Sequence, residues 1–309
     1  MSVLKAYRFK IYPDEAQKQF FVATFGCVRF TYNHLLVASQ QKKEQKLTPA
    51  KLKKEYPFLK ETDSLALANA QRNLEKAFRR YFTGKSDFPK FKHKSNPWQS
   101  YTTNNQGHTI YLKEGQLKLP KLKSLVKVNY HREITGQIKS ATISAKNNTD
   151  FYVSILCVEE IPSLPQTSQS ITIAYSPSEL LEGSQSLLQI TFNQDSLVTK
   201  IDKVQKKLKI RAKVARKNRI PLAEAKNYQK LKERLARLQV SQKEKKEDFF
   251  DQLSYYLVCH FDQIMVDATI IENNQEACTV VFTKADWHCF YKKLVYKSNW
   301  YGKKLIDLD

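Results

Sequence analysis

The stretch VLKAYRFKIY, residues 3–12, decides the first part of the fold. Leu4, Ala6, Phe9 and Ile11 alternate with other side chains and a proline follows directly, so the stretch predicts a β-strand that ends in a turn. Helical patterns come next in the chain. Because a single strand cannot satisfy its own backbone hydrogen bonds, this strand must pair with segments much further along.

The sequence predicts helices directly after this strand. Asp14 is a suitable N-cap for a first helix through Phe25, a second helix follows through Leu36, and a third runs from Asp63 or Ser64 to about residue 82. The third helix points one set of residues inward, namely Leu67, Ala70, Leu74, Ala77, Phe78 and Tyr81, and another largely outward, namely Asn69, Arg72, Asn73, Lys76 and Arg79.

Short strands return between residues 98 and 160, separated by glycines and by an Asn-Asn pair. The economical arrangement is a small β-barrel built from residues 1–12 and 98–160. Residues 13–97 would then be a helical domain inserted between its strands, and residues 161–169 a linker.

Residues 170–309 alternate strands and helices in an order that resembles an RNase H-like fold, whose central sheet presents metal-binding carboxylates. Strands are expected at 171–176, 187–192, 263–271 and 303–308, a long basic helical region at about 197–261, and a helix at 286–299. The chain is therefore predicted to be an α+β multidomain protein.

The charge of the chain points to a polyanionic partner. There are 52 Lys or Arg against 30 Asp or Glu, a formal charge of +22, and nucleic acid is the expected partner. Residues 200–246 hold 18 Lys or Arg against 4 Asp or Glu at helical spacing, which favours phosphate contact over a merely solvated face. The loop FPKFKHKSNPW, residues 88–98, interleaves aromatic residues with lysines and can stack on unpaired bases. For any one of its aromatic residues core packing is slightly favoured, and for its lysines phosphate contact is favoured.

Other classes of partner are disfavoured. No run of about 18 apolar residues occurs, and the N-terminus resembles neither a signal nor a transit peptide, so we expect no membrane partner and a cytoplasmic location. We expect no small-molecule substrate and no cofactor. The five cysteines form no C-x-x-C pair, which argues against a disulfide framework or a zinc ribbon. One conceivable metal set is rejected because neighbouring residues on one element point apart: Cys259, His260, Cys278, His288 and Cys289.

Seven segments, in order, resemble TnpB, the RNA-guided nuclease encoded by insertion-sequence transposons. They are KAYRFKIYPDEAQ (5–17), FGCVRFTYNHLL (25–36), DSLALANAQRNLEKAFRRYF (63–82), FPKFKHKSNPWQSYTTN (88–104), LKLPKLKSLVKVNYHREITGQIKSATIS (117–144), FYVSIL (151–156) and WHCFYKKLVYKSNWYGKKL (287–305). The resemblance implies a wedge-type β-barrel interrupted by a helical recognition domain, followed by a RuvC-like domain of the RNase H type with a basic helical insertion.

The sequence departs from that family where its metal ligands lie. The family carries G-I-D-L-G on the first RuvC strand, and the aligned residues 172–176 place Ala174 at the Asp. At the fourth strand the family has E-D-L, whereas this chain has Asp267 followed by Ala and Thr. The family continues into a zinc ribbon and a last catalytic Asp, while this sequence stops at Asp309. We therefore expect a degenerate RuvC-like domain that lacks the zinc ribbon.

Cleavage by two metal ions needs several oxygen ligands, and the degenerate positions leave too few. The chain resembles the nuclease-dead TnpB-like repressors, the TldR proteins. The resemblance implies a guide RNA, a double-stranded DNA target beside a short protein-read motif, transcriptional repression, no enzyme activity and a nucleoid-associated prokaryotic location. Two alternatives stay open: a residual nuclease that uses Asp267 with improvised ligands, and a decayed transposon-derived RNA binder.

The resemblance also implies which residues contact each nucleic acid. Amides and arginines on one helix and the following strand would read the DNA motif, since they can make bidentate contacts to bases. These are Ser64, Asn69, Arg72, Asn73, Lys76, Thr102, Thr103 and Asn104. Guide RNA contacts would fall on Arg8, Lys10, Lys90, Lys92, Lys94, Arg132, Lys206, Arg211 and Arg216.

Overall fold

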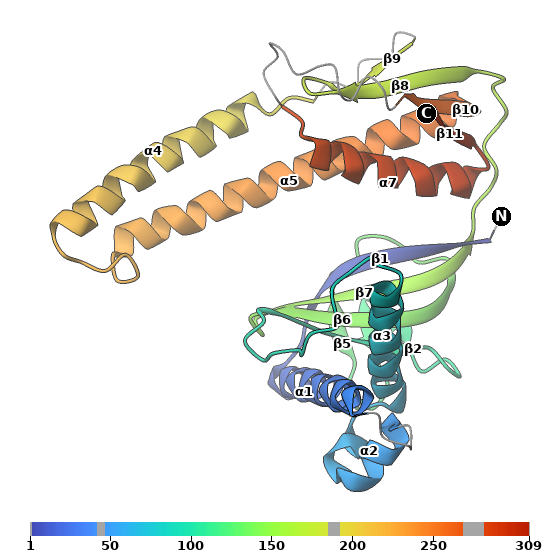
Figure 1. The fold of residues 1–309 in the computed structure, drawn as a ribbon, viewed down its shortest axis with the longest axis vertical. Coiled ribbons are helices and arrows are strands. Elements are labelled where there is room, and N and C mark those ends of the chain that lie inside the picture. Colours follow the sequence, from blue (N-terminus) through green and yellow to red (C-terminus); the bar gives the residue numbers. More distant parts are fainter. Residues whose placement is uncertain (1, 42–46, 185–191, 268–280, 309) are drawn as a thin grey trace. The chain divides into compact units, whose positions relative to one another are not determined.

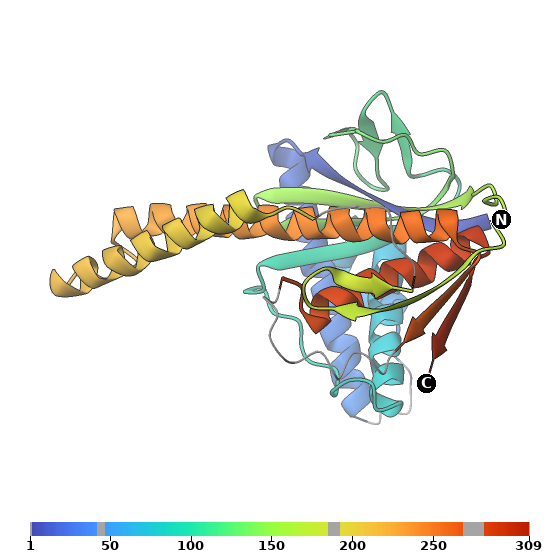
Figure 2. The same cartoon turned by 90° about the horizontal axis from the view of Figure 1, so that it is seen from above.

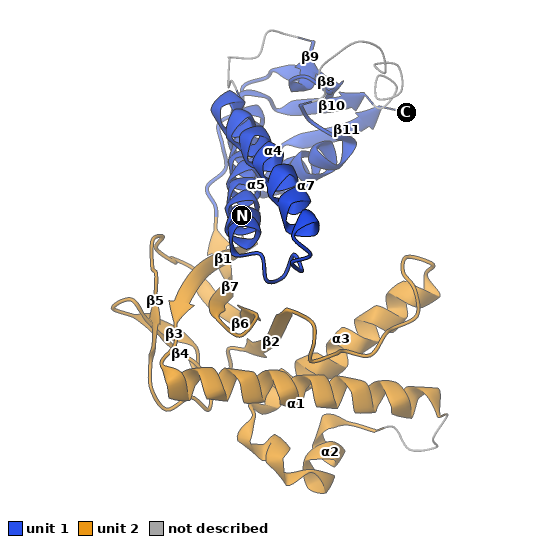
Figure 3. Cartoon of the chain, turned by 90° about the vertical axis from the view of Figure 1, so that its left-hand side faces the viewer, with its two compact units in different colours: residues 1, 161–309 blue, residues 2–160 orange. Residues whose placement is uncertain are grey.

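A computed structural model describes residues 2–41, 47–184, 192–267 and 281–308. The chain divides into two compact units, residues 2–160 and residues 161–309 together with Met1 (Figure 3). Three features expected from the sequence lie wholly or mostly outside the described residues: the strand at 187–192, the end of the strand at 263–271, and Cys278.

The first unit is built on one curled seven-stranded sheet. Its strands are β1 (Ser2–Tyr12), β2 (Trp98–Asn104), β3 (Tyr111–Lys113), β4 (Gln116–Lys118), β5 (Val126–Val128), β6 (Gln137–Lys146) and β7 (Asp150–Glu160). Their order is β2-β6-β7-β1-β5-β4-β3. Within the described residues β2 and β3 are edge strands, so the part of the chain expected to form a small β-barrel has the form of a curled sheet with two edges.

The first strand finds its partners far along the chain. Residues Ser2 to Ile11 of β1 pair antiparallel with β7, and the end of β1 pairs with β5. Tyr7, Phe9 and Ile11 are buried, whereas Leu4 and Ala6 are exposed. The predicted strand is confirmed, but the four apolar residues do not share one face: side chains of one face are two residues apart, and Leu4 and Ala6 have the opposite parity to Phe9 and Ile11.

Helices cover the first unit's sheet. They are α1 (Glu15–Gln40), α2 (Pro49–Glu55), the short 3-10 helix Pro57–Glu61 and α3 (Ser64–Phe82). Asp14 is confirmed as N-cap of α1, because its side chain accepts the backbone N–H of Gln17 at 2.8 Å while Gln17 reaches back to the N–H of Asp14. The prediction of two helices here is wrong, since α1 is one continuous helix of 26 residues.

The core of the first unit lies between its sheet and the helices α1 and α3. Phe21 contacts the rings of Tyr101 on β2 and Phe151 on β7. The inward side of α3 is confirmed for Leu67, Ala70 and Leu74, which are buried. Tyr81, expected inward, is exposed near the end of that helix. The first half of α3 is therefore packed in the core, whereas Tyr81 in its last turn is exposed.

The second unit has a four-stranded sheet in the order β11-β10-β8-β9. Its elements are β8 (Ser170–Ser176), β9 (Leu180–Gly183), α4 (Asp195–Lys217), α5 (Lys226–His260), β10 (Gln263–Asp267), α7 (Lys284–Tyr301) and β11 (Lys304–Leu308). The strand β10 is parallel to both β8 and β11, whereas β9 is antiparallel to β8. The sequence patterns did not predict β9. Helices α5 and α7 pack together beside this sheet (Figures 1 and 2).

The long basic region forms a helical hairpin. Helices α4 and α5 run side by side and extend beyond the sheet of their own unit in both views (Figures 1 and 2). Leu197, Ile201 and Val204 of α4 are buried, while its more distal cationic residues are exposed. Among the helices that the structure describes, none combines the length and apolarity that crossing a membrane requires.

Candidate nucleic-acid interface

One side of α3 presents polar residues beside the edge strand β2. Arg72, Asn73 and Lys76 are exposed, and their spacing of three and four residues places them on one helical face. Ser64 is exposed at the start of the helix and accepts a hydrogen bond from Lys53. This face can offer a guanidinium, an amide and an ammonium to an approaching ligand.

Two residues that were expected on that face are instead buried and make hydrogen bonds within the first unit. Asn69 is buried, and its amide donates to the backbone carbonyl of Thr102 at 2.9 Å and to Asn104 Oδ1 at 3.2 Å. Thr103 is buried with its hydroxyl donating to Asp63. The expectation that Asn69 faces outward is wrong because β2 packs against α3 at this point. Thr102 and Asn104 remain partly exposed.

Substitutions at Asn69 and Arg72 are expected to have different consequences. Asn69→Ala removes two partly buried hydrogen bonds, each contributing about 0.5–1.5 kcal/mol, and should lower the free energy of unfolding by about 1–3 kcal/mol. Arg72→Ala, at an exposed position, should change it by less than about 0.5 kcal/mol. Urea unfolding of the two variants measures this difference. Equal stability of both would show that Asn69 does not support the junction between α3 and β2.

Arg8 and Lys10 lie on β1 with their charges held near other side chains. The guanidinium of Arg8 lies 4.5 Å from the ring centroid of Tyr152 and 6.0 Å from that of Trp98. Lys10 Nζ lies 3.1 Å from Asp150 Oδ1, and this hydrogen bond raises the pKa of Lys10 above its ordinary value. Lys10 therefore keeps its positive charge at neutral pH.

The basic loop is held against α1 by its backbone. Asn33 of α1 donates its amide to the carbonyl of Lys92 at 3.0 Å and accepts the N–H of Lys92 at 2.9 Å. The ammonium of Lys92 lies 4.4 Å from the ring centroid of Tyr32. Lys90 and Lys94 are exposed, and Arg132 is exposed on the loop after β5. The loop is thus a fixed support for cations.

Lys206, Arg211 and Arg216 all lie on α4 and are exposed. They belong to the helical hairpin, whereas the other expected RNA-contacting residues belong to the first unit. The structure groups them by unit: three on the hairpin, and Arg8, Lys10, Arg132 and the loop lysines on or near the curled sheet.

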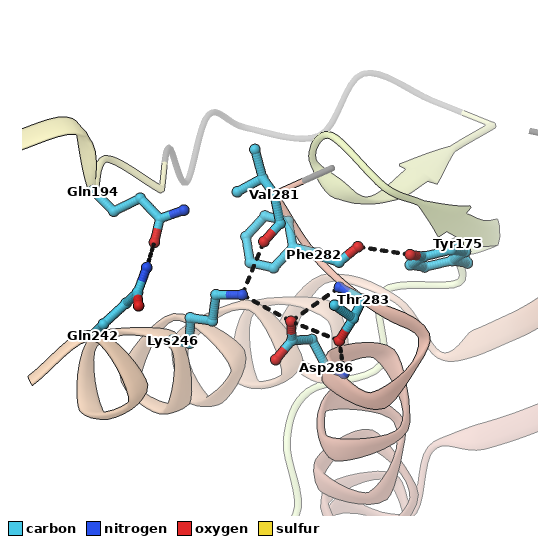
Figure 4. Close-up of polar contacts among 8 residues, drawn as sticks. All are labelled: Tyr175, Gln194, Gln242, Lys246, Val281, Phe282, Thr283 and Asp286. Carbon is cyan, nitrogen blue, oxygen red and sulfur yellow. Dashed lines mark hydrogen bonds and ion pairs between the residues drawn. The ribbon is translucent and has the colours of Figure 1, made fainter. Parts of the chain in front are cut away.

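The root of the hairpin is fastened by a partly buried ion pair. Lys246 of α5 lies 2.8 Å from Asp286 Oδ2 and donates to the carbonyl of Val281 at 2.9 Å (Figure 4). Asp286 also accepts the N–H and hydroxyl of Thr283, which caps α7. Burial would raise the pKa of the Asp286 carboxyl, but the bonds from Lys246 and Thr283 outweigh it and hold that pKa below its ordinary value.

The strand ends of the second unit bring Ala174 and Asp267 together. Ala174 of β8 is the register partner of Asp267 on β10 and of Glu182 on β9, so the three form one row across the sheet. Partners in such a row share a face of the sheet. Glu182 is the carboxylate that the sequence alone could not place beside Ala174, because β9 had no clear pattern.

The resemblance to TnpB implies bound metal ions, and the positions of these residues show whether they could hold such ions. Ala174 offers no oxygen ligand, and Glu182 and Asp267 are separated by a strand, or about 10 Å at two strand spacings. Within the described ranges no group of three or more His, Cys, Asp or Glu is placed to hold a metal ion. The residues that the structure describes therefore do not by themselves fit a metal site.

Comparisons with known proteins begin at the N-terminus. Residues 1–46 match a family model for the helix-turn-helix domain of the OrfB/IS605 type. Over the described part of that range, the structure has the strand β1 followed by the single helix α1.

Two relatives match along almost the whole chain. An RNA-guided DNA endonuclease of Streptomyces pristinaespiralis is 26% identical over 327 residues, covering 99% of this chain and 78% of the relative. The RNA-guided DNA endonuclease InsQ of Escherichia coli is 21% identical over 338 residues, covering 99% of this chain and 80% of the relative. A solved Cas12f1–sgRNA–target DNA complex has a TM-score of 0.50 at 11% identity, covering 96% of this chain and 73% of that one, which shows a similar fold.

These relatives correct one expectation from the sequence. The departures at Ala174 and Asp267 and the stop at Asp309 led us to expect a chain that is not an enzyme, yet both relatives are named as endonucleases. The comparisons therefore contradict the expectation that this chain has no enzyme activity. The N-terminal family match and the two nearly full-length relatives thus show that the chain is similar to TnpB/IS605-type RNA-guided endonucleases.

Proposed function

We propose that this chain binds a guide RNA and uses the pairing of that RNA with DNA to select a target. The observation that carries the proposal is the hairpin of α4 and α5, which displays exposed cations at the end away from its buried root. Eighteen Lys or Arg between residues 200 and 246 supply the charge that a structured RNA needs. The names of the relatives support both halves of the proposal.

We further propose that the exposed side of α3 reads a short motif in the DNA. Arg72 and Asn73 carry the two side-chain types that make bidentate contacts with guanine and adenine in the major groove. Asn69 would act indirectly, by fixing β2 beside this face through Thr102 and Asn104. The guide would supply most of the sequence specificity, and this face a short anchor.

The consequence for the DNA depends on whether the complex cuts. Both relatives are named as endonucleases, which supports cleavage of DNA by this chain. Among the described residues, Asp267 and Glu182 are the carboxylates that flank Ala174. We propose that the complex also represses transcription when its target lies in a promoter, because a stretch of DNA paired with RNA and held by protein excludes polymerase. Such a protein would work at the nucleoid.

Purification of the chain from its host, followed by sequencing of the bound RNA, tests the proposal. We expect one structured RNA species with a variable end. The RNA-loaded protein is then incubated with matched and mismatched DNA in the presence of Mg²⁺. Retention of matched DNA supports guided binding, and specific fragments would report cleavage. Bound RNA without guide-dependent retention of DNA would instead identify a simple RNA binder and contradict the proposal.

A further inference from the structure

A pocket of about 460 Å³ lies in the first unit between α1, the basic loop and the start of β2. Phe25 and Val28 of α1 belong to its lining, together with the half-exposed rings of Phe91 and Trp98. This volume falls within the range of small-ligand sites, which is about 300–1,000 Å³. Sequence patterns contain no direct sign of this pocket, because its lining residues come from segments up to 75 positions apart.

The walls of the pocket are fixed by hydrogen bonds. Gln99 donates its amide to the carbonyls of Asn96 at 2.8 Å and His93 at 3.3 Å, and it accepts Arg29 Nη1 at 3.1 Å. Asn96 accepts the N–H of Trp98 at 2.9 Å. Together with the two bonds between Asn33 and the Lys92 backbone, these contacts fix the loop before any ligand arrives. A ligand would therefore lose little affinity to ordering of the site.

The lining combines two kinds of chemistry. Phe91 and Trp98 offer aromatic rings, Arg29 offers a guanidinium and Lys92 an ammonium group. No carboxylate occurs among the lining residues that the structure describes. Arg29 uses one donor on Gln99, and a guanidinium has five donors in all. A flat aromatic group joined to an anion fits this combination, and an acidic peptide without a ring would leave the aromatic surfaces unused.

We propose that this pocket holds one unpaired nucleotide, whose base stacks on Trp98 or Phe91 while Arg29 and Lys92 bind its phosphate. The inference rests on the proposed function, since it names a site for a single strand of the guide RNA or of the DNA that the proposed function requires. It also separates two roles within the basic loop. Lys90 and Lys94 lie outside the lining and contribute only charge, whereas those residues from Phe91 to Ser100 that line the pocket contribute the binding site. The strand can be the guide RNA or displaced DNA, which share this chemistry.

Ultraviolet crosslinking of the full chain to short single-stranded RNA or DNA, followed by peptide mapping, tests the occupant. We expect nucleotide adducts within residues 91–100, and the preferred strand identifies the source. Trp98→Leu should weaken binding of the short oligonucleotide by roughly 5- to 150-fold, which corresponds to about 1–3 kcal/mol of lost stacking. Arg29→Gln should weaken binding and also reduce its salt dependence, because a phosphate contact is lost.

Tyr111→Leu is the matched control, because it removes an exposed aromatic residue of the same unit outside the pocket. Its affinity should match the original chain, and circular dichroism checks that all three variants fold. Two results together would overturn the pocket inference alone: the chain binds RNA without adducts at residues 91–100, and Trp98→Leu and Tyr111→Leu bind the oligonucleotide with equal affinity. A chain that binds no RNA at all would overturn the proposed function and the inference with it.

Discussion

The affinity of the chain for nucleic acid is expected to fall by roughly 10³- to 10⁵-fold between about 50 and 200 mM salt, if it neutralises about 6–10 phosphates. The physical cause is counterion release. Each phosphate contact frees a condensed cation, and added salt reduces that entropic gain. The formal charge of +22 and the exposed cations of the hairpin support this number of contacts. Filter binding over a salt series measures the slope, and a flat response would contradict the electrostatic basis of binding.

A triple variant assigns part of that slope to the hairpin. Lys206→Gln, Arg211→Gln and Arg216→Gln together should reduce the slope of log affinity against log salt by about 2–3, at about 0.7–0.9 per lost contact. The control removes the same charge from exposed positions of the same unit outside the hairpin, with Lys284→Gln, Lys292→Gln and Lys304→Gln. The control should leave the slope nearly unchanged. An equal loss in both would mean that net charge, and no particular surface, drives binding.

Lys246→Met is expected to destabilise the second unit by about 3 kcal/mol, the low end for breaking a buried ion pair. Lys246 and Asp286 have 16% and 22% of their side chains exposed, so removing the ammonium strands a mostly buried carboxylate. The carbonyl of Val281 loses its donor as well. Hydrogen exchange of α5 and α7 in increasing urea measures the effect on this unit by itself.

Lys243→Met is the matched control, because Lys243 pairs with Glu247 on the same helix while 78% of its side chain is exposed. Such a surface pair contributes at most about 0.5 kcal/mol. If Lys246→Met and Lys243→Met were equally stable, the pair at the root would not fasten the hairpin to α7.

The ion pair between Lys246 and Asp286 should make the stability of the second unit depend on pH. The folded protein holds the pKa of Asp286 below the ordinary value of 3.8, so ionised Asp286 stabilises the fold above that value. The contribution is lost as pH falls through the lowered pKa. The stability gap between the original chain and Lys246→Met should therefore narrow below about pH 4. A gap that stays constant down to about pH 2 would contradict this account.

Local patterns predicted individual elements better than their assembly. Alternation in residues 3–12 was sufficient to predict a strand, and the mixed α+β class is confirmed by the structure and by the solved relative. The lack of a nearby partner correctly predicted that β1 pairs far along the chain, but the choice of β7 and β5 and the register of these pairs leave no local signal. Likewise β9 has only four residues, too few for a pattern.

The candidate site shows the same limit. Helical spacing correctly placed Arg72, Asn73 and Lys76 on an exposed face. It failed at Asn69, because burial there is imposed by β2, and periodicity within a helix carries no information about a neighbouring strand. Arg29 was missed altogether. Its partner Gln99 is 70 positions away, and a single arginine in an amphipathic helix looks like any solvated residue.

The central claim is that RNA held by this chain chooses the DNA, and exchanging the guide tests it most directly. The chain is loaded with either of two RNAs that differ only in the spacer, and each complex is offered both DNA targets beside the same motif. The account predicts that each complex retains its matched DNA and releases the other, and that exchanging the spacers exchanges the DNA retained. Retention of both targets alike, regardless of the spacer, would contradict it.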